Sequence, residues 1–147
     1  DSVPYAVELE KAGVDCFDVS TGISIHRPRF VTISPTARQP MGTYVHLAQA
    51  VRQAVKVPVI AAGRINTSEI AGGILEEGKA DLTGLGRQLI ADPMWPKKTM
   101  EGHLDEIILC DSCNRYCWRN SGYVKMSPGV PICHRNPQAG REWEAAA

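Results

Sequence analysis

A repeated order of helix, glycine and strand constrains the fold of this chain more than any other sequence feature. The predicted helices cover 3–12, 43–55 and 67–78, and the predicted strands cover 14–19, 57–62 and 80–85. Apolar residues recur at helical spacing in each helix, and Gly13 and Gly78 each indicate a helix end. The second strand is almost wholly apolar, which is typical of a parallel strand covered on both faces. The order therefore predicts an α/β fold with a parallel sheet.

Three parallel strands are too few to close a barrel, and an open sheet of three leaves both of its edges unpaired. The sequence thus predicts either a small open sheet or part of a larger one. From Pro93 onward the regular order stops, with one short helix expected around 97–102 and then an irregular tail rich in Cys, Gly and Pro. Because the chain opens on Asp1 and ends on three alanines, we expect it to be a piece of a longer protein.

Composition argues against several classes of function. Lys and Arg number 16, and Asp and Glu also number 16, so the formal net charge of zero does not favour nucleic acid or an anionic membrane as a partner. No apolar run approaches the roughly 20 residues of a membrane helix, and no basic leader precedes an apolar segment. We therefore expect a globular, cytoplasmic protein that binds neither nucleic acid nor membrane.

Two of the predicted strands are each followed by a glycine and an arginine. Gly63 and Arg64 follow the second strand, and Gly86 and Arg87 follow the third. In (β/α)8 barrels the loops after the seventh and eighth strands commonly bind phosphate, because a glycine admits the anion close to the backbone and an arginine supplies a bidentate charge. A short helix over 88–92 would complete such a site. The other interpretation is two turn glycines beside two solvent-exposed arginines.

Four of the five cysteines, Cys110, Cys113, Cys117 and Cys133, lie within 24 residues. In an unexported protein, clustered thiols indicate metal binding rather than disulfides. Three thiolates from one tight loop and a fourth from farther along the chain suit the four iron corners of a 4Fe-4S cluster. Structural zinc is the alternative, although zinc sites more often show two separate Cys-x2-Cys pairs. Cys16 stands alone in an apolar stretch, where we expect a small buried side chain.

His26 follows the first predicted strand, on the rim of a barrel where catalytic residues lie. Because imidazole exchanges protons near neutral pH, His26 is a candidate general acid or base, although a histidine in a loop is more often a surface residue. His46, His103 and His134 have no comparable position, and we expect structural roles for them. His134 directly follows Cys133 and is also a candidate for hydrogen bonding near the metal.

In their order along the chain these segments resemble the iron-sulfur branch of the Old Yellow Enzyme family, which includes bacterial 2,4-dienoyl-CoA reductase, enoate reductases and trimethylamine dehydrogenase. The resemblance is carried by residues 9–15, 57–65, 78–81, 85–93, 101–102, the cysteine motif and 136–142. It implies the C-terminal part of an FMN-binding (β/α)8 TIM barrel followed by an irregular Cys-rich segment that binds a 4Fe-4S cluster. The expected boundaries are 1–103 for the barrel, 104–140 for the cluster segment and 141–147 for the start of a linker.

The resemblance also implies a role for each candidate residue. Gly63, Arg64, Gly86 and Arg87 correspond to residues that hold the FMN phosphate, and the four clustered cysteines correspond to cluster ligands. In the family the cluster relays electrons to FMN from an FAD reduced by NAD(P)H, and both of those sites would lie outside this chain. His26 lies on the motif Thr-Gly-Ile-x-x-His, whose histidine helps to protonate the substrate. The implied activity is reduction of an activated C=C bond in an enoyl or dienoyl substrate, either an enoate or a dienoyl thioester.

Three features depart from the family's pattern, and the most serious is that the first five barrel strands, with the tyrosine partner of the histidine and most contacts to the flavin ring, are not in this sequence. The segment between Cys117 and Cys133 is longer than usual, and Gly72 stands where an acidic residue is common. Two alternatives remain: a non-catalytic zinc-binding or interaction module, and an amine-oxidising flavoenzyme similar to trimethylamine dehydrogenase. The sequence leaves the oligomeric state open, and a homo-oligomer of the longer enzyme is one alternative. The chain by itself is expected to be inactive.

Overall fold

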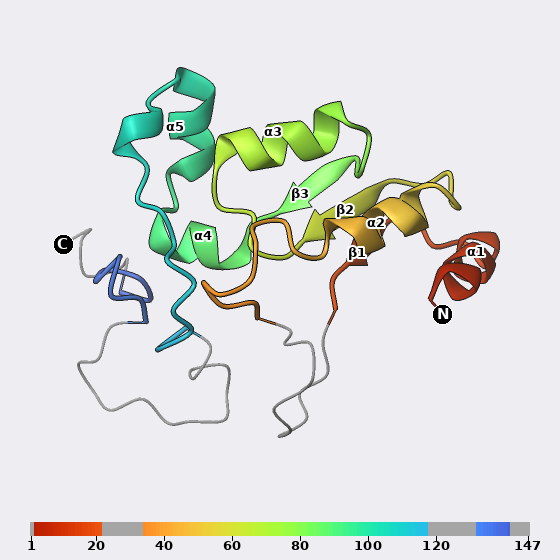
Figure 1. Ribbon diagram of the computed structural model, residues 1–147, viewed down its shortest axis with the longest axis horizontal. Helices are drawn as coiled ribbons and strands as arrows, with labels where there is room; N and C mark the ends of the chain where they lie inside the picture. Colours follow the sequence, from red (N-terminus) through yellow and green to blue (C-terminus); the bar gives the residue numbers. More distant parts are fainter. Residues whose placement is uncertain (1, 22–33, 118–131, 142–147) are drawn as a thin grey trace. The chain divides into compact units, whose positions relative to one another are not determined.

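The computed structural model describes residues 2–21, 34–117 and 132–141, which belong to two compact units, Asp1–Leu85 and Gly86–Ala147 (Figure 1). The helices and strands of the first unit are α1 (Val3–Lys11), β1 (Phe17–Val19), α2 (Val45–Arg52), β2 (Val59–Ala62), α3 (Ser68–Glu76) and β3 (Leu82–Gly84). The predicted order of helices and strands is confirmed, and each strand is shorter than predicted. The units divide after Leu85, so the functional boundaries expected after residues 103 and 140 stay predictions.

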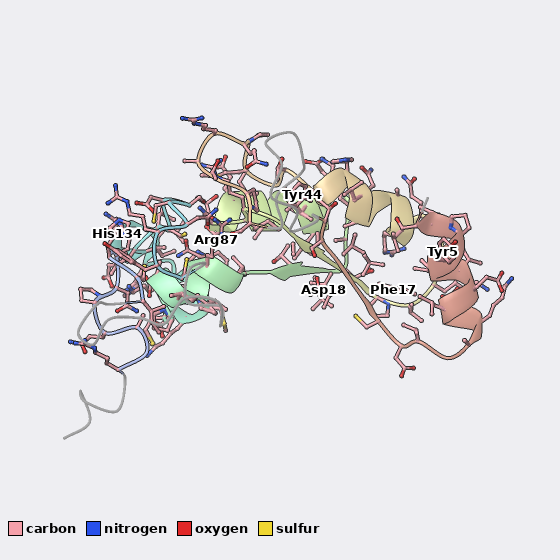
Figure 2. All side chains as sticks on the ribbon, turned by 90° about the horizontal axis from the view of Figure 1, so that it is seen from below. Tyr5, Phe17, Asp18, Tyr44, Arg87 and His134 are labelled. Atoms are coloured by element: carbon pink, nitrogen blue, oxygen red, sulfur yellow. The ribbon has the colours of Figure 1, made fainter. Side chains whose placement is uncertain are left out.

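The three strands form one parallel sheet in the order β1-β2-β3, as predicted. Helices α2 and α3 lie on the same side of this sheet (Figure 2). Val59 and Ala61 on one face of β2 are fully buried, whereas the other face carries Ile60 between the exposed Asp18 and Leu82. Within the described residues helices cover only one face of β2, because both helices approach the sheet from one side, and the covering of the other face stays a prediction.

The predicted signals for helix ends are present in the first unit. Gly13 follows α1 with a φ of 99°, and Gly78 follows α3 with a φ of 64°. Both values lie in the left-handed region, which costs glycine little and other residues about 1–2 kcal/mol. Of the two candidate caps of α3, Thr67 is the cap, and its Oγ1 accepts a hydrogen bond from the N–H of Ile70 at 3.3 Å.

The expected burial of Cys16 is wrong, because its side chain is exposed. Cys16 lies just before β1, which begins at Phe17. In the described sheet β1 is an edge strand that pairs with β2 on one side only. No described neighbour beyond β1 is therefore present to cover this thiol.

Three short helices begin the second unit: α4 (Gly86–Ala91), α5 (Trp95–Glu101) and the 3-10 helix η1 (Leu104–Glu106). The helix expected over 88–92 begins two residues earlier than predicted, and the helix expected around 97–102 is α5. Gly102 ends α5 with a φ of 80°. No helix in the described part of the chain is long and apolar enough to cross a membrane.

Candidate functional site

Gln88 on α4 positions the backbone that carries the first clustered cysteine. Its side chain is 1% exposed and binds the backbone at two points: Nε2 donates to the carbonyl of Ile108 at 3.0 Å, and Oε1 accepts from the N–H of Cys110 at 2.9 Å. Both polar ends of this buried amide are thus satisfied, as a buried amide requires. Gln88 therefore fixes the start of the cysteine loop against α4.

Asp92, directly after α4, fixes the same segment one turn farther along. Its side chain is almost fully buried; Oδ2 accepts from the N–H of Ile108 at 2.9 Å and from Nζ of Lys98 at 2.8 Å, and Oδ1 accepts from the N–H of Met94 at 3.0 Å. Burial by itself would raise the pKa of the Asp92 carboxyl, but these donors outweigh burial and hold its pKa below the ordinary value. Asp92 is therefore an ionised anchor for the loop that follows.

All four clustered cysteines line one small cavity in the second unit. Cys110, Cys113 and Cys117 come from one loop, and Cys133 comes from the segment 132–141. The lining also includes Arg87, whose charge suits an anionic thiolate-bound group. The tertiary structure thus brings together the four thiols that the sequence selects as metal ligands.

The spacing of the thiols bears on which metal group they would hold. Among the described residues, one group of three potential ligands has its ligand atoms within 4.8 Å of one another, and it is Asp111, Cys113 and His134 rather than any three thiols. Four thiolates at about 2.3 Å from a single tetrahedral zinc would lie about 3.8 Å apart. A 4Fe-4S cluster binds each thiolate to a different iron and so accommodates more widely separated sulfurs. No three of the described thiols therefore lie as close together as the ligands of one tetrahedral zinc ion would.

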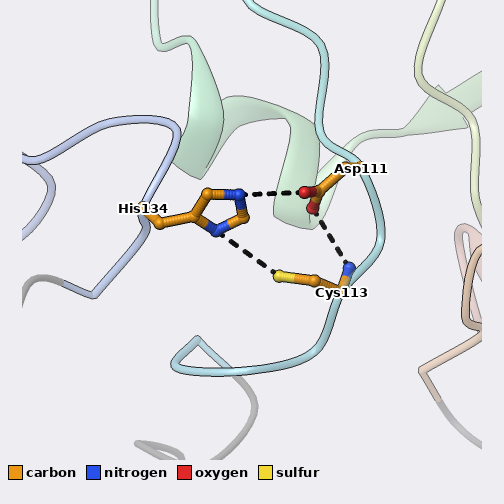
Figure 3. A group of neighbouring side chains, drawn as sticks. All are labelled: Asp111, Cys113 and His134. Carbon is orange, nitrogen blue, oxygen red and sulfur yellow. Dashed lines mark hydrogen bonds and ion pairs between the residues drawn. The ribbon is translucent and has the colours of Figure 1, made fainter.

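His134 and Asp111 lie beside the sulfur of Cys113 (Figure 3). Nε2 of His134 is 2.9 Å from Oδ2 of Asp111, and Nδ1 is 3.6 Å from Sγ of Cys113. Burial, together with the adjacent Asp111 carboxylate, raises the pKa of the Cys113 thiol. For Asp111, burial opposes ionisation, but hydrogen bonds from Cys113 and the proximity of His134 lower its pKa. His134, which follows Cys133 in the sequence, thus contacts another of the four clustered cysteines, Cys113.

Gly63 and Arg64 follow β2 in the first unit. Gly63 has a φ of 127°, and a Cβ at this position would lie 2.7 Å from Cδ2 of Tyr44, so both the backbone and the packing require glycine. Arg64 donates from Nη1 to the carbonyl of Gln39. Backbone conformation and packing therefore explain the glycine at position 63 without a ligand. The phosphate-binding role of Gly63 and Arg64 stays a prediction.

Gly86 and Arg87 open α4 in the second unit. A Cβ at Gly86 would meet no atom of the described structure within 4 Å, and its φ is not in the left-handed region, so local packing does not explain this glycine. Nη1 of Arg87 donates to Oδ1 of Asn114 at 2.6 Å. Across the described residues no carboxylate forms an ion pair with Arg87. Within the described residues Arg87 therefore has an amide partner and no carboxylate partner, and its phosphate-binding role stays a prediction.

His26 lies outside the described residues, so its catalytic role stays a prediction. His46 is exposed on α2, and His103 lies 3.3 Å from Oε1 of Glu106 through its Nδ1. The structural roles expected for these two histidines stay predictions.

None of the polar residues that contact the cysteine loop or lie in it was predicted as a functional residue from the sequence; they are Gln88, Asp92, Asp111 and Asn114. The sequence does distinguish Gln88 and Asp92, because these two polar residues flank the apolar run 89–91. Polar residues that flank a short apolar helix just before a metal motif are candidates for contacts to the loop that follows. No comparable signal distinguishes Asn114 from other loop asparagines.

Residues 3–106 match the NADH:flavin oxidoreductase / NADH oxidase family. A metal reductase from Desulforamulus reducens is 43% identical over 140 residues, which cover 95% of this chain and 20% of the relative. An NADH oxidase from Thermoanaerobacter brockii is 42% identical, over 91% of this chain and 20% of the relative. A cinnamate reductase from Clostridium sporogenes is 34% identical, over 97% of this chain and 21% of the relative. The chain therefore spans about a fifth of the length of these curated relatives.

One solved structure, that of 6-hydroxypseudooxynicotine amine oxidase from Pseudomonas geniculata N1, matches with a TM-score of 0.66 and 27% sequence identity. The match covers 78% of this chain and 16% of that protein. This likeness supports the mixed helix and strand architecture, and the relatives extend the sequence match across the cysteine motif. The resemblance stated from the sequence is thereby confirmed. The chain belongs to the NADH:flavin oxidoreductase / NADH oxidase family.

Proposed function

We propose that this chain is part of a flavin- and iron-sulfur-dependent oxidoreductase that uses electrons from NAD(P)H to reduce an activated C=C bond. The family description supports the flavin and the NADH, and a relative named cinnamate reductase supports an α,β-unsaturated acid as the substrate class. One observation on the chain itself carries the proposal furthest. The four clustered thiols line the same cavity, and four thiolates are the ligands that a 4Fe-4S cluster needs.

In this proposal Cys110, Cys113, Cys117 and Cys133 hold a 4Fe-4S cluster, which passes single electrons when bound. Gln88 and Asp92 keep the loop in place before any metal is present, because their hydrogen bonds are made to backbone groups of residues 108–110. Preorganisation of this kind lowers the entropy lost when ligands converge on a metal. Iron, labile sulfide and zinc measured after anaerobic purification test the assignment. We expect about four irons and four sulfides per chain, and stoichiometric zinc without labile sulfide would overturn it.

The fold that we propose for the longer enzyme is a (β/α)8 barrel, with residues 1–103 as its C-terminal part. The single covered face of the sheet supports this arrangement, because barrel strands carry helices outside and pack side chains inside. The open face that carries Asp18, Ile60 and Leu82 would then line the interior. Residues 104–140 would form the cluster segment, and residues 141–147 would begin a linker to the FAD and NAD(P)H regions.

We further propose that Gly63, Arg64, Gly86 and Arg87 hold the phosphate of FMN, a cofactor that supplies hydride for C=C reduction when bound. Arg87 is the best supported of the four, because no described carboxylate competes for its charge. An Arg87→Ala enzyme should retain its iron while it loses FMN on dialysis. Retention of FMN at the unsubstituted level would remove Arg87 from the cofactor site.

His26 is proposed as the proton donor to the carbon that becomes negatively charged after hydride addition. A positioned general acid contributes about 10²- to 10⁴-fold to turnover. The His26→Ala enzyme should therefore lose activity by about that factor while its FMN and iron content persist. Unchanged turnover would exclude His26 from the mechanism.

Amine oxidation is the second candidate, because a solved structure that matches this chain is that of an amine oxidase. The direction of electron flow separates the two reactions. An enoate such as cinnamate would reoxidise flavin that NADH has reduced, whereas an amine substrate would reduce oxidised flavin without any NADH. Because one relative is a metal reductase, ferric iron belongs in the same panel of oxidants. Anaerobic absorbance at the flavin band, recorded with each compound, decides between these reactions.

A further inference from the structure

Asn114 connects the cysteine loop to Arg87. It lies between Cys113 and Cys117, and its Oδ1 accepts a hydrogen bond from Nη1 of Arg87 at 2.6 Å. Both side chains are half-buried, and both line the cavity that the four cysteines share. The residue after Arg87 is Gln88, which binds Cys110, so two successive residues of α4 contact the cysteine loop at two places.

The chemistry of Asn114 suits a residue that orients an arginine without neutralising it. An amide oxygen accepts one of the five guanidinium N–H groups and carries no charge, so the remaining donors and the full positive charge stay available for an anion. A carboxylate in the same place would compensate the charge that a phosphate needs. Asn114 has a φ of 54°, a left-handed value that asparagine tolerates better than most residues, so the loop backbone aims this side chain at Arg87.

We propose that Asn114 is a positioning residue that holds Arg87 ready for the flavin phosphate and thereby couples the cluster loop to flavin binding. The inference rests on the proposed function, because it takes Arg87 as a phosphate ligand and Cys113 and Cys117 as cluster ligands. A free arginine loses side-chain entropy when an anion orders it, and a hydrogen bond made in advance reduces that loss. Any treatment that disorders the loop should then weaken FMN binding, and the coupling should act in both directions.

A double-mutant cycle on the full-length enzyme tests this inference, with the dissociation constant of FMN measured by fluorescence titration of the FMN-free protein. The variants are Arg87→Ala, Asn114→Gly and the two combined. Glycine is chosen because it removes the side chain and accepts a positive φ without strain. Arg115→Ala is the matched control, because it removes an exposed positive charge from the next position of the same loop. Iron and labile sulfide are measured for every variant.

We expect Arg87→Ala to weaken FMN binding about tenfold or more, and Asn114→Gly to weaken it about three- to tenfold with iron and sulfide retained. The double variant should bind FMN as weakly as Arg87→Ala alone, because the inference assigns the effect of Asn114 on FMN to its hydrogen bond with Arg87. The Arg115→Ala control should bind FMN normally.

Failure of the inference and failure of the proposed function give different results. If Arg87→Ala leaves FMN binding unchanged, the phosphate role of Arg87 in the proposed function is overturned, and the inference with it. If Arg87→Ala weakens binding but Asn114→Gly does not, or if the two effects add in the double variant, only the inference is overturned. Loss of iron in Asn114→Gly would also overturn it, since the side chain would then serve the loop rather than Arg87.

Discussion

The two units of this chain are stabilised in different ways. In the first unit, apolar side chains of α2 such as Ala48 and Val51 pack on a sheet whose strands pair through their backbones. In the second unit, beyond its short helices, hydrogen bonds from Gln88 and Asp92 hold an irregular segment against α4. Burial of many apolar groups spreads stability over a unit, whereas a few buried polar groups concentrate it at single positions.

This difference has a consequence for mutation and for function. The first unit tolerates most single substitutions outside its closest contacts, because each residue contributes a small part of its free energy of unfolding. A unit held by a few polar side chains depends strongly on each of them, because their removal leaves buried donors and acceptors without partners. The second unit also carries the four clustered thiols, so its polar contacts control the geometry of the proposed metal centre.

The largest loss of stability is expected from Gly63→Ala, which places a methyl group at the closest contact in the first unit. The added methyl group would overlap Tyr44, and alanine rarely adopts a φ of 127°. Together these costs amount to about 4 kcal/mol. Native-state hydrogen exchange of the β2 amides measures the loss, and the amides of the second unit should keep their protection.

Gly78→Ala is the matched control for this substitution. Gly78 also has a positive φ, but a Cβ there would meet nothing within 4 Å, so only backbone strain of about 1 kcal/mol is expected. Equal effects of the two substitutions would show that the contact with Tyr44 is unimportant.

A somewhat smaller effect, about 3 kcal/mol, is expected from Asp92→Ala, which breaks the second unit at its anchor. The substitution leaves the Ile108 N–H without its acceptor and leaves the Lys98 ammonium with the carbonyl of Glu106 but without its carboxylate partner. Hydrogen exchange of the peptide that covers residues 106–111 should accelerate while that of β2 stays slow. The control is Asp105→Ala, which removes an exposed carboxylate from the neighbouring η1. Equal exchange rates in the two variants would argue against the anchor.

The smallest loss of stability is expected on lowering the pH, because protonation of Asp92 removes its charge but leaves its oxygens in place. The pKa of Asp92 is lowered in the folded protein, so its stabilising contribution is complete above the ordinary carboxyl pKa of 3.8 and is lost as pH falls through the lower folded value. Protection of residues 106–111 should therefore decrease below about pH 3.8. The decrease should be weaker in Asp92→Asn, and an unchanged pH dependence in that variant would exclude Asp92 as its source.

The same contrast explains which predictions were confirmed. The order of helices and strands, the parallel pairing, Gly13 and the Thr67 cap follow from local periodicity and backbone preference, and the structure has all of them. The expected burial of Cys16 and the expected covering of both faces of β2 depend on which elements lie across the sheet. Local pattern carries no information on that point: Cys16 is exposed, and the described helices cover one face of β2 only.

The sequence by itself determined the chemistry that this protein has available: an α/β frame, two glycine-arginine pairs, and four thiols at a spacing suited to a metal group. These features are local, because each depends on residues close together along the chain. Only the tertiary structure decided that all four thiols line one cavity, that His134 contacts Cys113, and that Asn114 binds Arg87 across 27 positions. Such contacts depend on where α4 meets the cysteine loop, which the buried hydrogen bonds of Gln88 and Asp92 establish.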